Sequence, residues 1–270
     1  MLENDLRGAL ERQEFTLSYQ PIVTAKDGSV QRAEALLRWN HPEFGVIFPG
    51  EFIPMAEEVG SIVQLGEWAF GCICDQILAW EKEGRPAITV SFNASPRQFS
   101  QPDFCDQLAA IIRKKGINSR LLQLEITEST AMQDMTDSST KLSFLKEMGM
   151  EVSVDDFGTG HSSLSYLKQL PIDRIKIDKS FTKNCVHDKR DAALVRAIVS
   201  MGHSLGLQVC AEGVETKAQL EFLRGLGCES IQGFLFSKSL PSDAFMEWVE
   251  ERTGEKRSFV RSRLSFFRGK

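Results

Sequence analysis

The sequence predicts an α/β fold, a modified (β/α)8 barrel with one antiparallel strand. About eight short runs have the apolar or alternating pattern of strands, and stretches of helical period separate nearly all of them. The first two runs lie too close together for a helical crossover, so the first strand is reversed. A chain of 270 residues with 42% hydrophobic residues is long enough for one such barrel, and we find no linker that divides it.

The amino-terminal part predicts a helix over residues 4–14 and then a β-hairpin. Residues 15–22 alternate as a strand does, 25–29 form a turn, and 31–39 form the second strand. This pairing places Gln20 roughly opposite Glu34. Glu34 lies inside an apolar strand, where an unpaired carboxylate is costly, and either a buried salt bridge or a metal ion could satisfy it.

The rest of the chain alternates between helices and strands. The predicted helices cover residues 49–58, 62–84, 103–115, 134–148, 164–168, 189–205, 217–226 and 242–252. The predicted strands cover residues 87–92, 121–127, 152–154, 174–178, 207–211 and 228–231. We therefore expect one barrel domain over residues 1–253 and a basic amphipathic tail over residues 254–270.

One predicted strand stops in a charged loop. The apolar residues 152–154 are followed at once by Asp155 and Asp156, and then by the glycine-rich residues 157–160. Because neighbouring side chains on a strand point to opposite faces, the two aspartates share a face only if the strand has ended and the backbone turns. Two carboxylates this close predict a magnesium or manganese site, with a solvated turn as the alternative.

Polar side chains end nearly every predicted strand. In a (β/α)8 barrel the carboxyl ends of the strands form the active face. Scattered salt bridges would explain any one of these residues but would not explain their gathering at one end. The residues are Glu34, Asn93, Glu125, Asp155, Asp156, Lys176, Asp178, Glu212 and Gln232.

This set of residues favours phosphodiester hydrolysis. The carboxylates and Asn93 supply enough oxygen ligands for two divalent cations, which would hold the attacking and leaving oxygens. Lys176 could hold the water or the phosphate, and Glu212 is the candidate general base. Barrel enzymes that stabilise an enolate use similar residues, but Arg38 suits a phosphate better. A serine nucleophile within residues 160–163 is disfavoured, because Leu164 stands where the nucleophile elbow needs glycine.

Composition limits the remaining classes. The net charge of -5 gives no overall attraction to DNA or acidic lipid, so an anionic ligand must be bound locally. The six cysteines include no Cys-x-x-Cys pair and no leader precedes them, which predicts reduced thiols in the cytoplasm. No apolar run reaches membrane-spanning length, and the four histidines lack the spacing of a zinc site.

Seven short motifs follow one another at the spacing of barrel strands. They are Glu34-Ala35-Leu36-x-Arg38-Trp39, Asn93 within residues 92–95, Glu125-Ile126-Thr127-Glu128, residues 155–160, Lys176-Ile177-Asp178, residues 211–215 and Gln232-Gly233. Together they resemble the EAL-domain family of cyclic di-GMP phosphodiesterases, over roughly residues 2–251. The resemblance implies a modified TIM barrel and magnesium- or manganese-dependent cleavage of cyclic di-GMP to linear pGpG.

The resemblance also implies a role for each matching residue. Glu128 would anchor the loop of residues 156–163 and couple metal binding to a homodimer interface. Calcium tolerates looser coordination and polarises water less, so it would support binding and inhibit cleavage. The metals would be bound by Glu34, Asn93, Glu125, Asp155, Asp156 and Asp178, the water by Lys176 and Glu212, and the nucleotide by Gln20, Leu36, Arg38 and Gln232.

The departures from the family pattern are few. His161 stands where a tyrosine is usual and Ala94 where a leucine is common, and neither supplies a metal ligand. The alternative function is a receptor that binds cyclic di-GMP without cutting it, as family members do when metal or base positions are lost, but none is lost here.

Two expectations concern the ends of the chain. It begins at the start of the domain, which suggests an excised domain from a longer protein with a sensor or diguanylate cyclase module, including the cytoplasmic part of a membrane-anchored protein. The tail interleaves basic and aromatic residues, and it could fray, pack on its own domain, or contact a membrane or partner.

Overall fold

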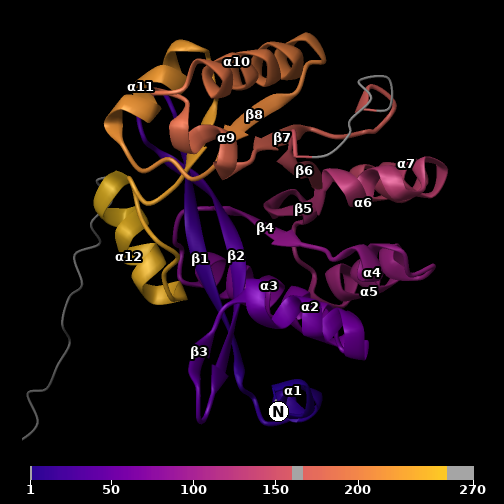
Figure 1. Ribbon diagram of the computed structural model, residues 1–270. Coiled ribbons are helices and arrows are strands. Elements are labelled where there is room, and N and C mark those ends of the chain that lie inside the picture. The colour runs from indigo at the N-terminus through magenta and orange to yellow at the C-terminus, as the bar shows by residue number, and fades with distance from the viewer. Residues whose placement is uncertain (1, 160–166, 254–270) are drawn as a thin grey trace, which may run out of the picture.

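The computed structural model describes residues 2–159 and 167–253 and confirms the predicted barrel (Figure 1). Its strands are β1 (Phe15–Thr24), β2 (Val30–His41), β3 (Gly45–Ile47), β4 (Thr89–Asn93), β5 (Leu122–Thr127), β6 (Glu151–Phe157), β7 (Arg174–Ile177), β8 (Gln208–Ala211) and β9 (Ser230–Gln232). Eight of them close into a ring in the order β1, β9, β8, β7, β6, β5, β4, β2, and β2 pairs back to β1. The ninth described strand, β3, extends β2 outside the ring.

Helices surround this ring. They are α1 (Leu2–Ala9), α2 (Pro49–Val59), α3 (Ile62–Lys82), α4 (Pro96–Phe99), α5 (Phe104–Lys115), the 3-10 turn η1 (Ser119–Leu121), α6 (Glu128–Gln133), α7 (Met135–Glu147), α9 (Lys179–Asn184), α10 (Lys189–Ser204), α11 (Lys217–Gly225) and α12 (Ser242–Thr253). Helix α10 packs on β7 and β8, and α12 packs on β1 (Figure 1).

The reversed first strand is confirmed by the strand pairing. β1 runs antiparallel to both of its ring neighbours, β2 and β9, whereas every other pair of neighbouring strands in the ring is parallel. Gln20 lies directly opposite Glu34 in the β1–β2 register, as the sequence predicted. Glu34 itself is in the middle of β2 and not at its end, because β2 continues beyond the ring to pair with β3.

The structure corrects the prediction that a strand ends before the paired aspartates. β6 continues through Phe157, and a bulge lies between Val154 and Phe157 in its pairing with β7. Asp156 adopts a positive φ of 53°, which is uncommon for a residue other than glycine. An extra residue in a strand breaks the alternation of side chains locally, so the bulge does what a strand end was expected to do.

Short elements escaped the sequence patterns. β3, α4, α6 and α9 were not predicted, since elements of three to six residues show no full period. The first helix ends at Ala9 and not at residue 14, because the chain turns at Gln13, which has a φ of 57°. The predicted helix over residues 164–168 and the tail over residues 254–270 fall largely or wholly outside the described residues.

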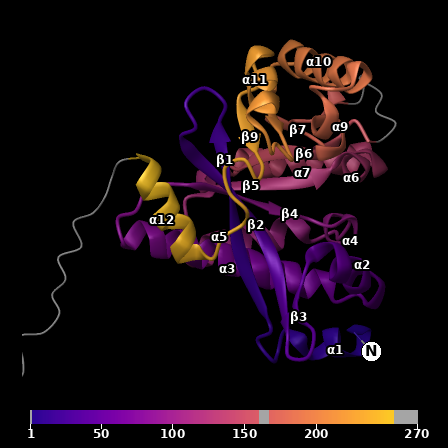
Figure 2. The same ribbon diagram turned by 60° about the vertical axis from the view of Figure 1, so that its left-hand side comes forward.

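The apolar core has a main part around the ring and a smaller part near Phe15 and Trp39. The smaller part lies toward the end of β1 and β2 where Figure 2 shows α1 and β3. In the smaller part the rings of Phe15 and Trp39 stack with centroids 5.9 Å apart, and Phe52 of α2 packs on both. Trp39 donates its indole N–H to Glu14 Oε2 at 2.9 Å. These contacts hold Trp39, the residue that follows Arg38 on β2.

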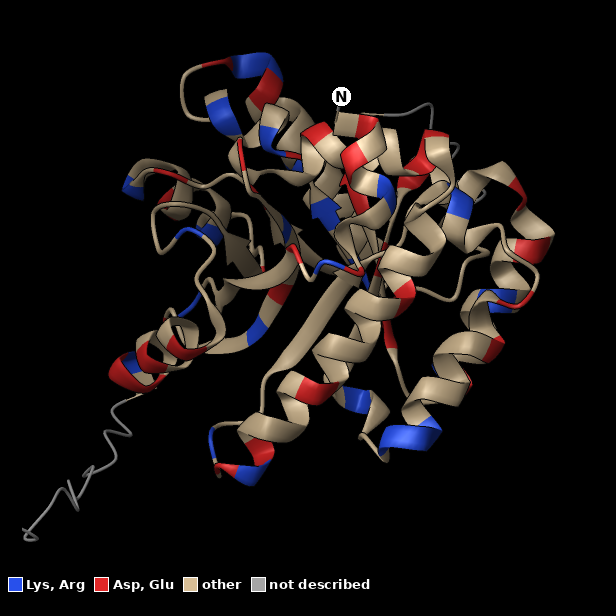
Figure 3. Cartoon of the chain, turned by 90° about the horizontal axis from the view of Figure 1, so that it is seen from below, with Lys and Arg blue, Asp and Glu red and all other residues tan. Residues whose placement is uncertain are grey.

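Charge is distributed without a dominant sign in the view of Figure 3, where acidic and basic residues are interspersed over the outer helices. No described helix is long and apolar enough to cross a membrane.

The backbone at Gly233, just after β9, lies very close to the backbone of Val214, and a substitution of Gly233 tests this contact. A Cβ atom there would lie 2.1 Å from Val214 O and 2.4 Å from Val214 N, and Val214 N–H donates to Gln232 O at 3.1 Å. We predict that Gly233→Ala lowers the free energy of unfolding by about 1–3 kcal/mol or more, because the backbone must move. Chemical denaturation measures this change.

The matched control is Gly225→Ala at the end of α11. No described atom outside the helix lies within 4 Å of the Cβ position there, so stability should be unchanged or slightly higher. Equal losses in the two variants would contradict the predicted close contact.

Candidate active site

The ammonium group of Lys176 lies at the centre of a carboxylate cluster inside the barrel. Its Nζ is 2.6 Å from Glu125 Oε2, 2.6 Å from Glu212 Oε1, 3.1 Å from Asp155 Oδ2 and 3.6 Å from Glu34 Oε2. Lys176 is 1% exposed and Glu125 is fully buried. These side chains come from different strands and loops, and they meet because the inward-facing residues at the carboxyl ends of barrel strands converge on one space.

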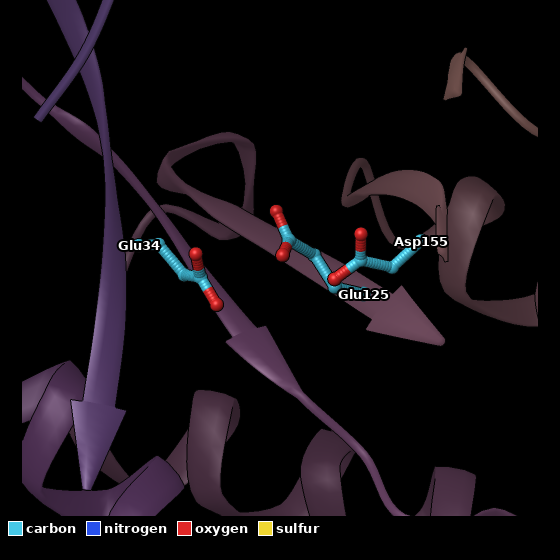
Figure 4. A group of neighbouring side chains, drawn as sticks. All are labelled: Glu34, Glu125 and Asp155. Carbon is cyan, nitrogen blue, oxygen red and sulfur yellow. The ribbon is translucent and has the colours of Figure 1, made fainter. Parts of the chain in front are cut away.

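Glu34 reaches the cluster from β2. Figure 4 shows its carboxylate directed into the same space as those of Glu125 and Asp155. Asn93 Nδ2 donates to Glu34 Oε1 at 2.7 Å, and Gln232 Nε2 donates to Glu34 Oε2 at 2.6 Å. The two expectations for Glu34 meet here, because it lies near a lysine and also belongs to a group that could hold a metal ion.

Two groups of carboxylates are close enough to share a cation. Glu34, Glu125 and Asp155 form the first group, and Asp155, Asp156 and Glu212 form the second. Within each group one oxygen from every residue lies within 4.8 Å of the others. Asp155 belongs to both groups, and Glu212, predicted as the general base, is also a candidate ligand.

Burial and crowding shift the pKa values of the cluster. Burial raises the pKa of Glu212 well above its usual range despite the nearby lysine, with repulsion from Asp155 and Glu34 adding to it. The pKa of Glu125 rises to about 7, again chiefly through burial. Burial also opposes the charge on Lys176, yet the surrounding carboxylates raise its pKa well above the usual range.

Glu34 differs from its neighbours. Burial acts to raise its pKa, but the charge of Lys176 and the hydrogen bonds from Gln232 and Asn93 outweigh it, so the pKa is lowered. The lowered pKa favours the ionised form of Glu34, whereas the raised pKa values of Glu125 and Glu212 favour their neutral forms.

The residues present fit one or two divalent cations. All the atoms that could ligate a metal here are oxygen atoms of carboxylates and amides, which are the ligands that magnesium and manganese prefer. Gln232 Oε1 is a buried acceptor for which the described residues provide no hydrogen-bond donor, and a cation or its water would satisfy it. Asn93 donates from its amide nitrogen to Glu34, and Oδ1 is the atom of this side chain that could bind a metal.

Asp178 and Glu128 have different surroundings from the cluster. Asp178 caps α9 by accepting from Ser180 N–H at 2.9 Å, and it belongs to neither carboxylate group, although with burial and Asp155 it raises the pKa of Asp156. The buried Glu128 accepts from Gly158 N–H at 2.9 Å, which fits the predicted loop anchor. The rest of the loop, residues 160–163, lies outside the described residues.

The expected nucleotide contacts lie beside the cluster. Gln20 accepts from Gln232 Nε2 at 3.2 Å, and Arg38 donates to Ser239 Oγ at 2.6 Å. A cavity of about 400 Å³ has Leu36, Pro49 and Asn93 among its mostly apolar lining residues. Leu36 and Asn93 are the lining residues that connect it to the predicted site, and its apolar walls suit the flat base of a nucleotide.

Sequence reasoning missed three residues of this region. Gln123 donates to Glu125 Oε1 at 3.3 Å, and its position two residues earlier on the same strand was a signal that could have found it. Ser239 and Phe48 both contact Arg38. They lie in loops or at a helix start, where no periodic pattern marks the side that faces the site.

Comparisons with known proteins agree with this arrangement. Residues 3–239 match the family model of the EAL domain, so the chain belongs to the EAL-domain family. The bifunctional diguanylate cyclase/cyclic di-GMP phosphodiesterase MucR of Pseudomonas aeruginosa is 46% identical over 248 residues, which are 92% of this chain and 36% of that protein. The cyclic di-GMP phosphodiesterase NbdA of the same organism is 39% identical over 248 residues, which are 92% of this chain and 32% of that protein.

Solved structures show the same fold. The MucR phosphodiesterase in complex with c-di-GMP has a TM-score of 0.87 at 46% identity and covers 90% of this chain and 99% of that one. The EAL domain of Mycobacterium smegmatis DcpA has a TM-score of 0.76 at 34% identity and covers 88% and 98%. The chain spans about a third of the length of the curated relatives MucR and NbdA.

The raised pKa of Glu125 predicts how stability depends on pH in a chelator. Since its folded pKa of about 7 exceeds the unfolded value of about 4.3, the folded state binds more protons between these values. The contribution of Glu125 to stability is complete below about pH 4.3 and is lost as pH rises through about 7. Chemical denaturation from pH 5 to 8 should therefore show a loss in the wild type that is smaller in Glu125→Gln.

Saturating magnesium should reduce the wild-type loss, because a bound cation takes the place of the proton. Identical pH dependence in the wild type and in Glu125→Gln would show that Glu125 is not protonated in the folded protein.

Proposed function

We propose that this protein hydrolyses cyclic di-GMP to linear pGpG in a reaction that depends on magnesium or manganese. The observation that carries the proposal is the carboxylate cluster around Lys176, at the end of the barrel strands where such folds perform chemistry. Further support comes from the relatives MucR and NbdA, which are named cyclic di-GMP phosphodiesterases, and from the solved MucR complex with c-di-GMP.

Four of the proposed cation ligands come from the two carboxylate groups. When bound, the cations would polarise the phosphodiester and the attacking water as Lewis acids. Asp155 would serve both cations, since it belongs to both groups. Asn93 and Asp178 remain proposed contributors at the edges of the cluster. The full proposed set of ligands is Glu34, Asn93, Glu125, Asp155, Asp156 and Asp178. Glu212 lies close to two of them, Asp155 and Asp156.

Glu212 and Lys176 would act on the proton of the attacking water. The water oxygen would bond to phosphorus as the P–O3′ bond breaks, Glu212 would accept a proton of the water, and O3′ would take a proton from solvent. Lys176 Nζ lies 2.6 Å from Glu212 Oε1, and this nearby positive charge favours the ionised carboxylate that a base needs. Lys176 donates to both Glu125 and Glu212, so it fixes the direction of the base relative to the ligands.

Substrate binding would use the residues beside the cluster. Arg38 supplies the positive charge for a phosphate, and its planar guanidinium can donate two parallel hydrogen bonds. Gln20 and Gln232 form a polar wall next to Glu34. The cavity bordered by Leu36 would receive a guanine base on its apolar side.

The direct test is a product assay. Purified protein is incubated with cyclic di-GMP and magnesium, and the nucleotides are separated by chromatography. We predict pGpG from the wild type and no detectable turnover from Glu34→Ala, which removes a residue of the first carboxylate group. The variant should keep its fold, because deleting a buried carboxylate leaves the apolar core intact.

The matched control is Glu43→Ala, an exposed carboxylate in the turn between β2 and β3, which should keep the wild-type rate. Wild-type activity in Glu34→Ala would remove this residue from the cation site. Tight binding of cyclic di-GMP by the wild type without pGpG would favour the receptor function.

The choice of cation provides a second prediction. Calcium accepts the same oxygen ligands as magnesium but tolerates longer and irregular coordination. Calcium should therefore support binding of cyclic di-GMP and suppress its cleavage, and excess calcium should inhibit the magnesium enzyme. A binding isotherm and a product assay on the same sample under each cation measure both effects. Full activity in calcium, or in excess chelator, would contradict the proposed dependence on the metal.

A further inference from the structure

The side chain of Arg38 is held on three sides. Its Nη1 donates to Leu37 O at 2.6 Å and its Nη2 donates to Ser239 Oγ at 2.6 Å. Its guanidinium carbon also lies 5.3 Å from the centroid of the Phe48 ring, within the range of a cation–π contact. The guanidinium has further N–H groups beyond the two that make these bonds, and they can face a phosphate.

Phe48 occupies a position that neither burial nor helix capping explains. The residue is 56% exposed. It is the N-cap residue of α2, where Ser, Thr, Asp or Asn would accept a hydrogen bond from the first turn, and the described structure shows no such side-chain bond. Its carbonyl accepts from Glu51 N–H at 2.9 Å, so the backbone of the helix start is formed without help from the ring.

We propose that Phe48 is a positioning residue that holds Arg38 ready to bind a phosphate of the dinucleotide, an inference that rests on the proposed function. A free arginine side chain samples many rotamers and loses that freedom when it binds. The ring of Phe48 and the hydroxyl of Ser239 restrict Arg38 before the ligand arrives. The loss on binding is therefore smaller, and the affinity is higher.

The turn between β2 and β3 offers a matched control. Phe44 lies in this turn, a few residues before Phe48, and at 54% its exposure is close to that of Phe48. Its ring packs on His41, with centroids 4.9 Å apart, and not on Arg38. A substitution of Phe44 removes an equally exposed aromatic ring without touching the arginine.

The experiment measures the dissociation constant of cyclic di-GMP for the calcium-loaded protein, together with KM and kcat in magnesium. Phe48→Ser and Phe48→Leu should bind roughly 3- to 10-fold more weakly than the wild type. Their KM should rise while kcat changes little, because Arg38 would bind the phosphate equally well in the ground state and in the transition state. Phe48→Tyr should restore binding, and Phe44→Ser should bind as the wild type does.

Melting temperature separates positioning from a structural role. Phe48→Ser introduces a preferred N-cap residue, so it should melt at or above the wild-type temperature although it binds more weakly. Wild-type affinity in both Phe48→Ser and Phe48→Leu would overturn the inference. If Phe48→Ser folds poorly, Phe48→Leu decides, since it keeps an apolar side chain and removes the ring. Failure of the wild type itself to bind cyclic di-GMP would overturn the proposed function and this inference together.

Discussion

The contact between one buried ammonium group and several carboxylates is the interaction on which the rest of the site depends. A charge removed from water is costly unless it is paired, and Lys176 is paired with Glu125, Asp155 and Glu212 at hydrogen-bonding distance. The same contacts hold the carboxylates together against their mutual repulsion. They also leave carboxylate oxygens close enough together to share a divalent cation, which prefers such ligands.

The backbone around this cluster is shaped to bring its members together. The bulge in β6 turns Asp155 and Asp156 toward one space, and the positive φ of Asp156 is the local cost of that turn. The absence of a side chain at Gly233 lets β9 approach Val214, which places Gln232 against Glu34. Glu128 accepts a hydrogen bond from the N–H of Gly158, directly after the end of β6. The bulge, the Gly233 contact and the Glu128 hydrogen bond all lie at or near the carboxyl ends of their strands.

Much of this arrangement could be predicted from the sequence. The alternating periods are long enough to specify a barrel, and the short connection between the first two strands specifies the reversed strand and the Gln20–Glu34 pair. The bulge could not be predicted, because a bulged strand and an ended strand have the same sequence pattern. Ser239 lies 201 residues from Arg38 in the sequence, and no local pattern reports such a contact. Phe48 is nearer in the sequence, but no periodic pattern marks the side of its ring that faces Arg38. The two groupings of the carboxylates depend on side-chain directions that spacing alone does not fix.

The central claim is that the cluster around Lys176 binds divalent cations through the two carboxylate groups that share Asp155. The most direct measurement is the anomalous scattering of manganese in crystals of the protein soaked with Mn²⁺ and cyclic di-GMP. The account predicts anomalous peaks among Glu34, Glu125 and Asp155 and among Asp155, Asp156 and Glu212, with a phosphate oxygen of the dinucleotide beside them. Fully bound dinucleotide with no anomalous peak at this cluster, or with manganese only at other carboxylates, would contradict it.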